Sequence, residues 1–187
     1  MKKTLLIIML LNLTLLNATT LQEVKEEAKT AIFKLKTTLG KKLKKNMKKG
    51  GPEQAAIFCS NQAIDLTHSV NISFANDTHI RRISLKERNS ANSPKSDERE
   101  VLLKIQKDYD SGKTVETLIV KKIYDDTYKV YKAIFIDKEV CLKCHGDITK
   151  RDKKAYKIIQ KDYPHDKATN YKMGDLRGAF VVTIVTK

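Results

Sequence analysis

The chain has 187 residues, which is the size of one domain with its own hydrophobic core, and it carries a formal net charge of +15. Most of the positive charge comes from lysine, and the lysines are spread along the chain. Because they are spread in this way, and because the N-terminus has the pattern of an export signal, we exclude nucleic acid as a partner.

Residues 1–18 have the pattern of a signal peptide. Lys2 and Lys3 form a basic start, the run from Leu5 to Leu16 is apolar, and Asn17-Ala18 offers a cleavage site. The apolar run is short for a membrane span. We therefore expect the signal to be removed and the protein to be periplasmic. A retained signal anchor is the alternative, because Leu16 is large for its position before the cleavage site.

Residues 19–49 are predicted to form an N-terminal helix, because apolar residues recur there at steps of three and four. They are Leu21, Val24, Ala28, Ile32, Leu35 and Leu39. The segment from Lys41 to Lys49 is rich in lysine, and we interpret it as a solvated helix face. A patch for membrane headgroups or for an acidic redox partner is the alternative.

Gly50-Gly51-Pro52 is expected to end this helix, and Pro52 suits the first turn of a second one. We place the start of the folded domain here, at residues 50–187. An apolar stripe runs along the second helix through Ala56, Cys59, Ala63, Leu66 and Val70. Periodicity alone therefore places Cys59 inward, where a free cysteine usually behaves as a small hydrophobic residue.

The remainder of the chain predicts strands alternating with short helices. Strands are expected at 79–85, 115–123, 128–136 and 176–186, and helices at 97–111 and 149–161. The residues from Asp125 to Thr127 predict a hairpin turn, and a fifth strand is considered between Val70 and Asn76. Neighbouring strands joined by a short hairpin predict an α+β fold, with an antiparallel sheet and helices over one face.

The segment Cys141-Leu142-Lys143-Cys144-His145 has the Cys-x-x-Cys-His pattern through which c-type haem is attached. Two thiols at this spacing add to the two vinyl groups of one porphyrin, and the histidine becomes the proximal iron ligand. The pattern therefore predicts one covalent haem c held by Cys141, Cys144 and His145. It agrees with export, because c-type haem is attached outside the cytoplasm. Cys59 is left unpaired.

Two other sites can contain a Cys-x-x-Cys pair. A structural zinc site needs a second ligand pair, and the sequence has no second cysteine pair and no His-x₃₋₅-His. A thioredoxin-like dithiol should open a helix directly after a strand, and Lys138-Glu139-Val140 is a poor match to that arrangement. We therefore favour haem over both.

Four blocks of the sequence resemble a family of exported single-haem proteins with a PAS-like fold, the Tll type first noticed in cyanobacteria. The blocks are 55–60; 80–86 with 88–89 and 92–94; 141–146; and 163–164 with 166–168 and 174–179. Two positions depart from the pattern. Ser90 lies where we expect Pro, and Asn170 lies where we expect Gly, although Asn tolerates positive φ better than most residues.

The resemblance implies a PAS-like α+β domain with the haem beside the sheet, and it implies that Cys59 is the sixth iron ligand. His165, Met173 or an open position are the alternatives. Haem propionates need cationic partners, for which Arg82 and Arg88 of the second block are our candidates. Pairing of these arginines with surface acids is the alternative.

These expectations favour a periplasmic haem protein that senses redox state or a small gas, or that carries one electron. The partner would then be a gas ligand or a redox protein. One alternative is a haem enzyme of the peroxidase or nitrogen-oxide reductase type, with His165 and Asp166 as a distal acid–base pair. The other is a haem-free thiol oxidoreductase.

Overall fold

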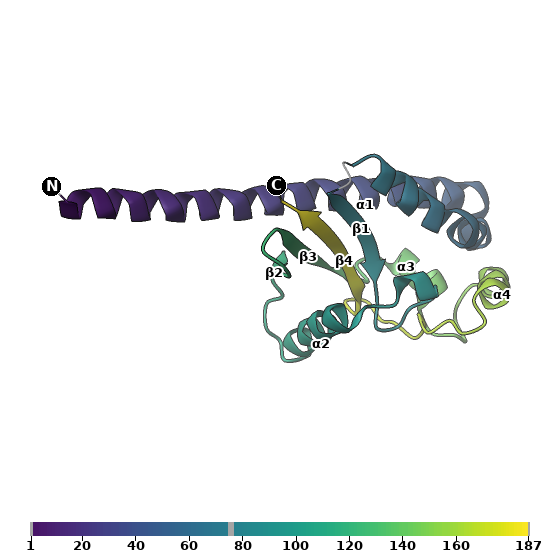
Figure 1. The fold of residues 1–187 in the computed structure, drawn as a ribbon. Helices are drawn as coiled ribbons and strands as arrows, with labels where there is room; N and C mark the ends of the chain where they lie inside the picture. The colour runs from purple at the N-terminus through teal and green to yellow at the C-terminus, as the bar shows by residue number, and fades with distance from the viewer. Residues whose placement is uncertain (1, 75–76, 187) are drawn as a thin grey trace.

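The computed structural model describes residues 2–74 and 77–186, with side chains from Leu21 onward. The predicted signal peptide, residues 1–18, lies outside the residues whose side chains are described. The elements follow one another along the chain as α1 (Lys2–Ile72), β1 (Thr78–Ile83), η1 (Ser90–Asn92), α2 (Ser96–Asp110), β2 (Ile119–Lys122), β3 (Thr127–Phe135), α3 (Glu139–His145), α4 (Lys153–Asp162) and β4 (Leu176–Val185). Figure 1 shows their arrangement.

The described strands form a four-stranded sheet in the order β1-β4-β3-β2, and every neighbouring pair is antiparallel. The predicted α+β fold and the hairpin between β2 and β3 are confirmed. Each strand agrees with its predicted range to within a few residues. The fifth strand is not found among the described residues, since residues 70–72 end α1 and residues 73–74 form a turn and a bend.

Element α1 consists of two helical segments that meet at a sharp bend. Gly50 and Gly51 lack helical dihedrals there, and Gly51 has φ 63° and ψ −155°. The chain doubles back at this point, so that the second segment runs beside the sheet end that carries α3 and α4 (Figure 1). The predicted break between two helices at Gly50-Gly51-Pro52 is therefore confirmed.

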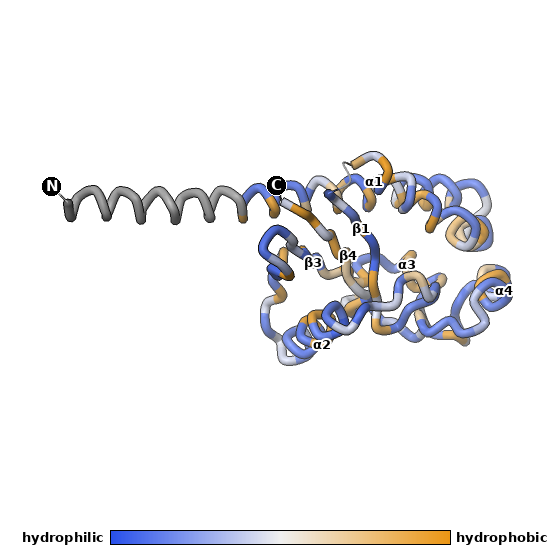
Figure 2. Tube along the Cα trace, viewed as in Figure 1, coloured by the Kyte–Doolittle hydropathy of each residue, from blue (hydrophilic) through white to orange (hydrophobic). Residues whose placement is uncertain are grey.

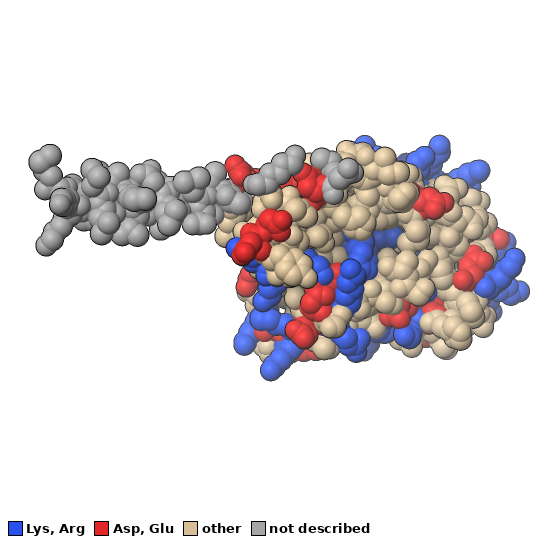
Figure 3. All heavy atoms as spheres, viewed as in Figure 1, with Lys and Arg blue, Asp and Glu red and all other residues tan. Residues whose placement is uncertain are grey.

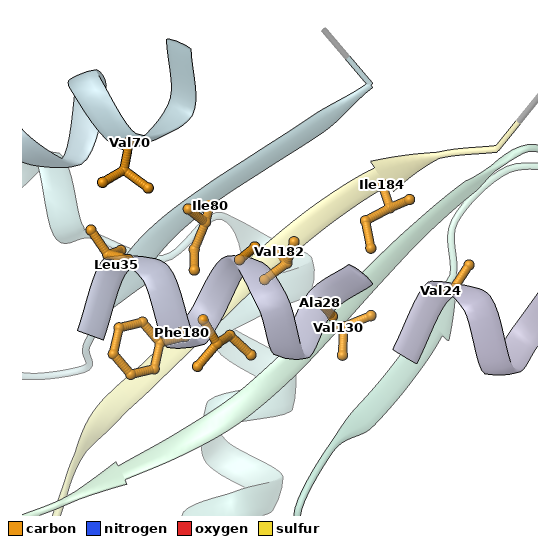
Figure 4. Packing of buried hydrophobic residues seen from close by; sticks show 11 residues of the cluster. Val24, Ala28, Leu35, Val70, Ile80, Val130, Phe180, Val182 and Ile184 are labelled. Carbon is orange, nitrogen blue, oxygen red and sulfur yellow. The ribbon is translucent and has the colours of Figure 1, made fainter. Parts of the chain in front are cut away.

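The first segment of α1 packs along one face of the sheet (Figure 4). Its apolar stripe, with Val24, Ala28 and Leu35, lies on inward residues of the strands that include Val130 and Val182. Residues 24–39 thus share a core with the sheet.

Helix α2 covers the opposite face, where Leu102 and Ile105 pack against Tyr131 and Val181. The expectation that helices cover one face was therefore wrong. The reason lies in β4, the inner strand that pairs with both β1 and β3. Apolar residues recur through β4 (Figure 2), and Val181 and Val182 point to opposite sides of the sheet. A strand that is apolar on both faces needs cover on both.

Helices α3 and α4 follow β3 and lie against the second segment of α1. Ala155 and Ile159 of α4 pack on Ala56, and Cys144 of α3 borders the same cluster. Helix α4 begins at Lys153 rather than at residue 149, because the Asp152 side chain accepts a hydrogen bond from the Ala155 amide and caps the helix there. Within the described part of the chain, no helix combines the length and apolar character needed to span a bilayer.

Candidate functional site

The short helix α3 carries the whole Cys-x-x-Cys-His segment. Cys141 and Cys144 are three residues apart and therefore lie on neighbouring positions of one helix face. The helix ends at Gly146, whose amide donates to the Leu142 carbonyl at 2.9 Å. A Cβ at this glycine would lie 2.6 Å from the same carbonyl oxygen, so this tight turn requires glycine.

His145 is held with one ring nitrogen engaged. Its Nδ1 lies 3.0 Å from the Ala168 carbonyl oxygen, which can only accept, and 3.3 Å from Arg88 Nη2, which can only donate. The shorter contact favours the tautomer that carries its proton on Nδ1. Burial and the nearby Arg177 and Arg88 guanidinium groups lower the pKa of the imidazole well below its usual value. His145 is therefore neutral, and its Nε2 lone pair is available for a metal.

Arg88 and Asp166 fix the loop behind His145. Arg88 Nη2 donates to the Cys144 carbonyl at 2.8 Å, and Arg88 Nε lies 3.2 Å from Asp166 Oδ1. The same Asp166 oxygen accepts from the Ala168 amide at 2.9 Å. Asp166 Oδ2 lies 3.7 Å from Nη1 of the buried Arg151. These contacts connect α3 to the peptide that accepts the His145 proton.

Asn170 closes the other side of this loop. It has φ 59° and is the one non-glycine residue with positive φ among the described residues. Its amide donates to the Gly146 carbonyl at 2.9 Å, and its side-chain oxygen accepts from the Ile148 amide at 3.2 Å. Asn thus adopts the conformation for which we expected Gly. At the other departure, Ser90 begins the short helix η1.

Cys59 reaches the site from the second segment of α1. It is half-buried, while Ala55, Ala56 and Phe58 on the same turn are buried. Burial raises the pKa of the Cys59 thiol, and the positive charges of Arg82 and Arg88 oppose this shift. Cys59 follows Ala56 by three residues, and Cys144 borders the cluster that contains Ala56. The fold therefore brings together helices whose cysteines are more than 80 positions apart in the sequence.

Arg82 has a donor without a partner. Among the described residues, its Nε is one of the buried polar atoms that form no hydrogen bond. Burial lowers the pKa of this guanidinium, and Cys59 and Tyr163 oppose the shift. A buried guanidinium N–H without a hydrogen-bond partner suits an anionic group such as a carboxylate. Arg88 Nε also forms no hydrogen bond, but it lies 3.2 Å from Asp166 Oδ1 as an ion pair, and Arg88 Nη2 donates to two backbone carbonyls.

The residues present fit a covalent haem. Cys141 and Cys144 are free thiols that would form the two thioethers, and His145 has an available Nε2 that would bind the iron. Cys59 is a further free thiol on the second segment of α1, and Arg82 Nε is an unused donor that would suit a propionate. The rival ligands lie at the surface, since His165 is exposed and Met173 is 46% exposed. Asp166 is engaged with the arginines, so it does not form an acid–base pair with His165.

The other possible uses of the cysteine pair receive little support from the geometry. Within the described residues, no three His, Cys, Asp or Glu side chains gather in a way that would hold a metal ion. A helix does begin shortly after β3, so our argument from residues 138–140 against a thioredoxin-like dithiol fails. However, burial raises the pKa of the Cys141 thiol and raises that of Cys144 to about 11, whereas a reactive dithiol needs a lowered pKa.

Comparison with known proteins decides the family. A profile described as Tll0287-like matches residues 17–185, which is most of the chain. The chain belongs to the Tll0287-like family. The resemblance stated from the four sequence blocks is thereby confirmed.

A solved member shows the same fold. The structure described as the cyanobacterial heme-protein Tll0287 matches with a TM-score of 0.64 and 22% sequence identity. The match covers 88% of this chain and 96% of that one. No curated protein matches the chain.

Sequence reasoning missed two contributors to the site, Arg177 and Arg151, and gave Asp166 a different role as the acid–base partner of His165. Arg177 belongs to the family-like blocks, and that membership was the available signal for it. Arg151 lies outside the blocks, in a lysine-rich stretch, and nothing near it in the sequence indicates a buried residue. In the structure Arg151 is 6% exposed and its guanidinium stacks on Tyr156 at 4.4 Å from the ring centroid.

Proposed function

We propose that this member of the Tll0287-like family binds one covalent haem, attached to Cys141 and Cys144, with His145 as the proximal ligand. The observation that carries the proposal is the position of the His145 imidazole, which lies on the same short helix as two free thiols and whose Nδ1 lies 3.0 Å from the Ala168 carbonyl oxygen. A histidine ligand oriented by a backbone carbonyl is common at protein metal centres. The description of the solved member as a heme-protein supports the same assignment.

Cys59 is proposed as the sixth ligand. It lies on the second segment of α1, three residues after Ala56, whose cluster Cys144 borders. Burial raises the pKa of the Cys59 thiol and Arg82 and Arg88 oppose this shift, so bound iron would have to supply the further positive charge that holds the sulfur as a thiolate. A thiolate donates electron density and stabilises ferric iron, so the reduction potential should be low. Reduction should weaken the bond to sulfur and expose the iron to a small gas.

Arg82 is proposed to bind a haem propionate, since its Nε has no hydrogen-bond partner. Arg88 was predicted for the same role, but its contacts favour positioning the His145 loop. The two arginines thus have different roles in the proposed site: Arg82 would bind a propionate, and Arg88 orders the peptide behind the proximal histidine.

We infer that the protein acts in the periplasm as a one-electron carrier or as a sensor of redox state or of a small gas. The export pattern in residues 1–18 supports the location. The haem supplies reversible one-electron chemistry when bound, and the chain supplies its ligands and charge environment. An enzyme with an acid–base pair at 165–166 is less well supported, because Asp166 is engaged with Arg88 and Arg151.

The test is mass spectrometry of protein matured in a periplasm that contains haem-attachment machinery. We expect the mass of one added haem, and we expect Cys141→Ser/Cys144→Ser to lose it. The controls are expression without the attachment machinery and the Cys59→Ser variant, which keeps both attachment thiols. An unmodified mass under permissive conditions would overturn the proposal.

A further inference from the structure

Two lysine-rich segments that are distant in the sequence lie at one end of the molecule. The first is the run before the α1 bend, in which all six lysines are exposed: Lys41, Lys42, Lys44, Lys45, Lys48 and Lys49. The second is α4, in which Lys153, Lys154, Lys157 and Lys161 are exposed. We call these ten residues the basic end.

Packing of α4 against α1 creates the basic end. Ala155 and Ile159 on the inner side of α4 contact Ala56 just beyond the bend. At the rim, Lys154 Nζ lies 3.6 Å from Glu53 Oε2. The α1 bend and α4 lie together on the right of Figure 1, and lysine and arginine atoms project from the same end in Figure 3.

The positive charge at this end has little local compensation. No acidic residue occurs from Gly40 to Pro52. The nearest acidic groups are Glu53, which is beside Lys154, Asp152, which caps α4, and Asp162 at the end of α4. By contrast, residues 21–39 of α1 contain three glutamates, Glu23, Glu26 and Glu27, beside four lysines. The excess of positive charge is therefore concentrated at the basic end. A helix face that is only solvated needs no such concentration of one charge.

The basic end lies directly outside the candidate haem site. The inner side of α4 packs in the same cluster as Cys144, and its outer side carries the lysines. A helix with its side chains is about 10 Å across, so a protein seated on α4 would approach Cys144 to roughly that distance. The basic end is therefore both strongly positive and close to the candidate haem site.

We propose that the basic end is the docking surface for an acidic one-electron carrier protein. The proposal rests on the proposed haem. One electron leaves the reduced centre of the partner and is taken up by ferric iron, so the partner is oxidised and the iron becomes ferrous. A protein is favoured over a membrane because Leu43 is the one large hydrophobic residue in the two segments that is largely exposed, at 40%.

The test uses the haem-loaded protein and an acidic plant-type [2Fe–2S] ferredoxin as the probe. The variant replaces Lys44, Lys45, Lys157 and Lys161 by Gln. The matched control removes the same charge from the α2 and β2 region by replacing Lys107, Lys113, Lys121 and Lys122, which are also exposed. Stopped-flow absorption gives the second-order reduction rate at several ionic strengths. Calorimetry with oxidised ferredoxin gives the affinity.

At low ionic strength we expect the basic-end variant to react about tenfold more slowly than the unchanged protein, with a flatter salt dependence. The control should stay within about twofold. Equal slowing in both variants, or none in either, would overturn the proposal. The proposal would also be overturned if the basic-end variant lost binding to phosphatidylglycerol vesicles but kept its binding to ferredoxin. That outcome would assign the surface to a membrane. A pyridine haemochrome assay detects failure of haem attachment separately, while calorimetry still tests docking.

Discussion

At the scale of single residues, Asp166 connects most of the contacts behind His145. Its carboxylate is 9% exposed, it accepts from the Ala168 amide, and it lies beside Arg88 and Arg151. Ala168 in turn accepts the His145 proton. Removing the charge of Asp166 would leave the guanidinium groups of Arg88 and Arg151 without their counter-charge. Both groups are largely buried, and an uncompensated buried charge lowers stability strongly.

We predict that Asp166→Asn lowers the free energy of unfolding by about 3 kcal/mol, measured by urea denaturation. The variant should also alter the ligand-field spectrum of the haem-loaded protein, because the His145 loop loses its anchor. Asp125→Asn is the control. Asp125 is fully exposed beside Lys122, and its replacement should leave stability and spectrum unchanged. Unchanged stability in Asp166→Asn would show that the arginines need no carboxylate.

Cys59 is the residue through which the iron environment can be tested. We predict that Cys59→Ser raises the reduction potential, makes ferric iron high-spin or water-ligated, and speeds CO binding to the ferrous form, since the thiolate is lost. Spectroelectrochemistry and flash photolysis measure these quantities. His165→Ala and Met173→Ala are the controls and should change none of them. If one of these controls shifts the spectrum and Cys59→Ser does not, the residue replaced in that control is the sixth ligand.

At the scale of elements, the bend in α1 decides where Cys59 lies. Gly51 has φ 63°, a value that L-residues rarely adopt, and nothing lies within 4 Å of a Cβ placed there. The obstacle to a side chain is therefore the backbone conformation rather than space. Without this bend, the second segment would continue away from the sheet and from α3.

We predict that Gly51→Ala lowers the free energy of unfolding by about 1 to 2 kcal/mol, because alanine is strained in this conformation. Gly40→Ala is the matched control on the same element. Gly40 is helical with open space around it, so the change should stabilise the protein by about 0.5 to 1 kcal/mol. Thermal or urea unfolding measures both. If both substitutions change the free energy of unfolding in the same direction, the backbone conformation of Gly51 is not the cause.

At the scale of the whole molecule, the sheet is enclosed by α1 on one face and α2 on the other. The first segment of α1 precedes the boundary that we placed at residue 50, yet its residues belong to the core. Leu35 is fully buried, whereas Leu43 on the same segment is 40% exposed. Residues 24–39 are therefore needed to cover the sheet.

We predict that Leu35→Ala lowers the free energy of unfolding by about 3 kcal/mol, since it leaves a cavity between α1 and the sheet. Leu43→Ala serves as the control and should cost well under about 1 kcal/mol. Urea denaturation followed by circular dichroism measures both variants. A small effect of Leu35→Ala would mean that the first α1 segment is not part of the cooperative fold.

The sequence by itself was sufficient for the features that depend on neighbouring residues. The pattern of Cys141 to His145, the strand bounds, the break at Gly50-Gly51 and the hairpin before Thr127 all follow from positions a few residues apart. Side-chain periodicity and turn preferences are local, and so they can be read along the chain. The inward placement of Cys59 was also predicted from its helix period.

Tertiary structure decided what depends on contacts between distant segments. Arg88 pairs with Asp166 from a distant part of the sequence, and Arg151 joins them from another segment. The whole chain must also pack before α2 covers the second face of the sheet. The same is true of the basic end, in which residues 41–49 and α4 come together. No local preference specifies such partners, because a buried charge finds its counter-charge only where packing brings the two segments together.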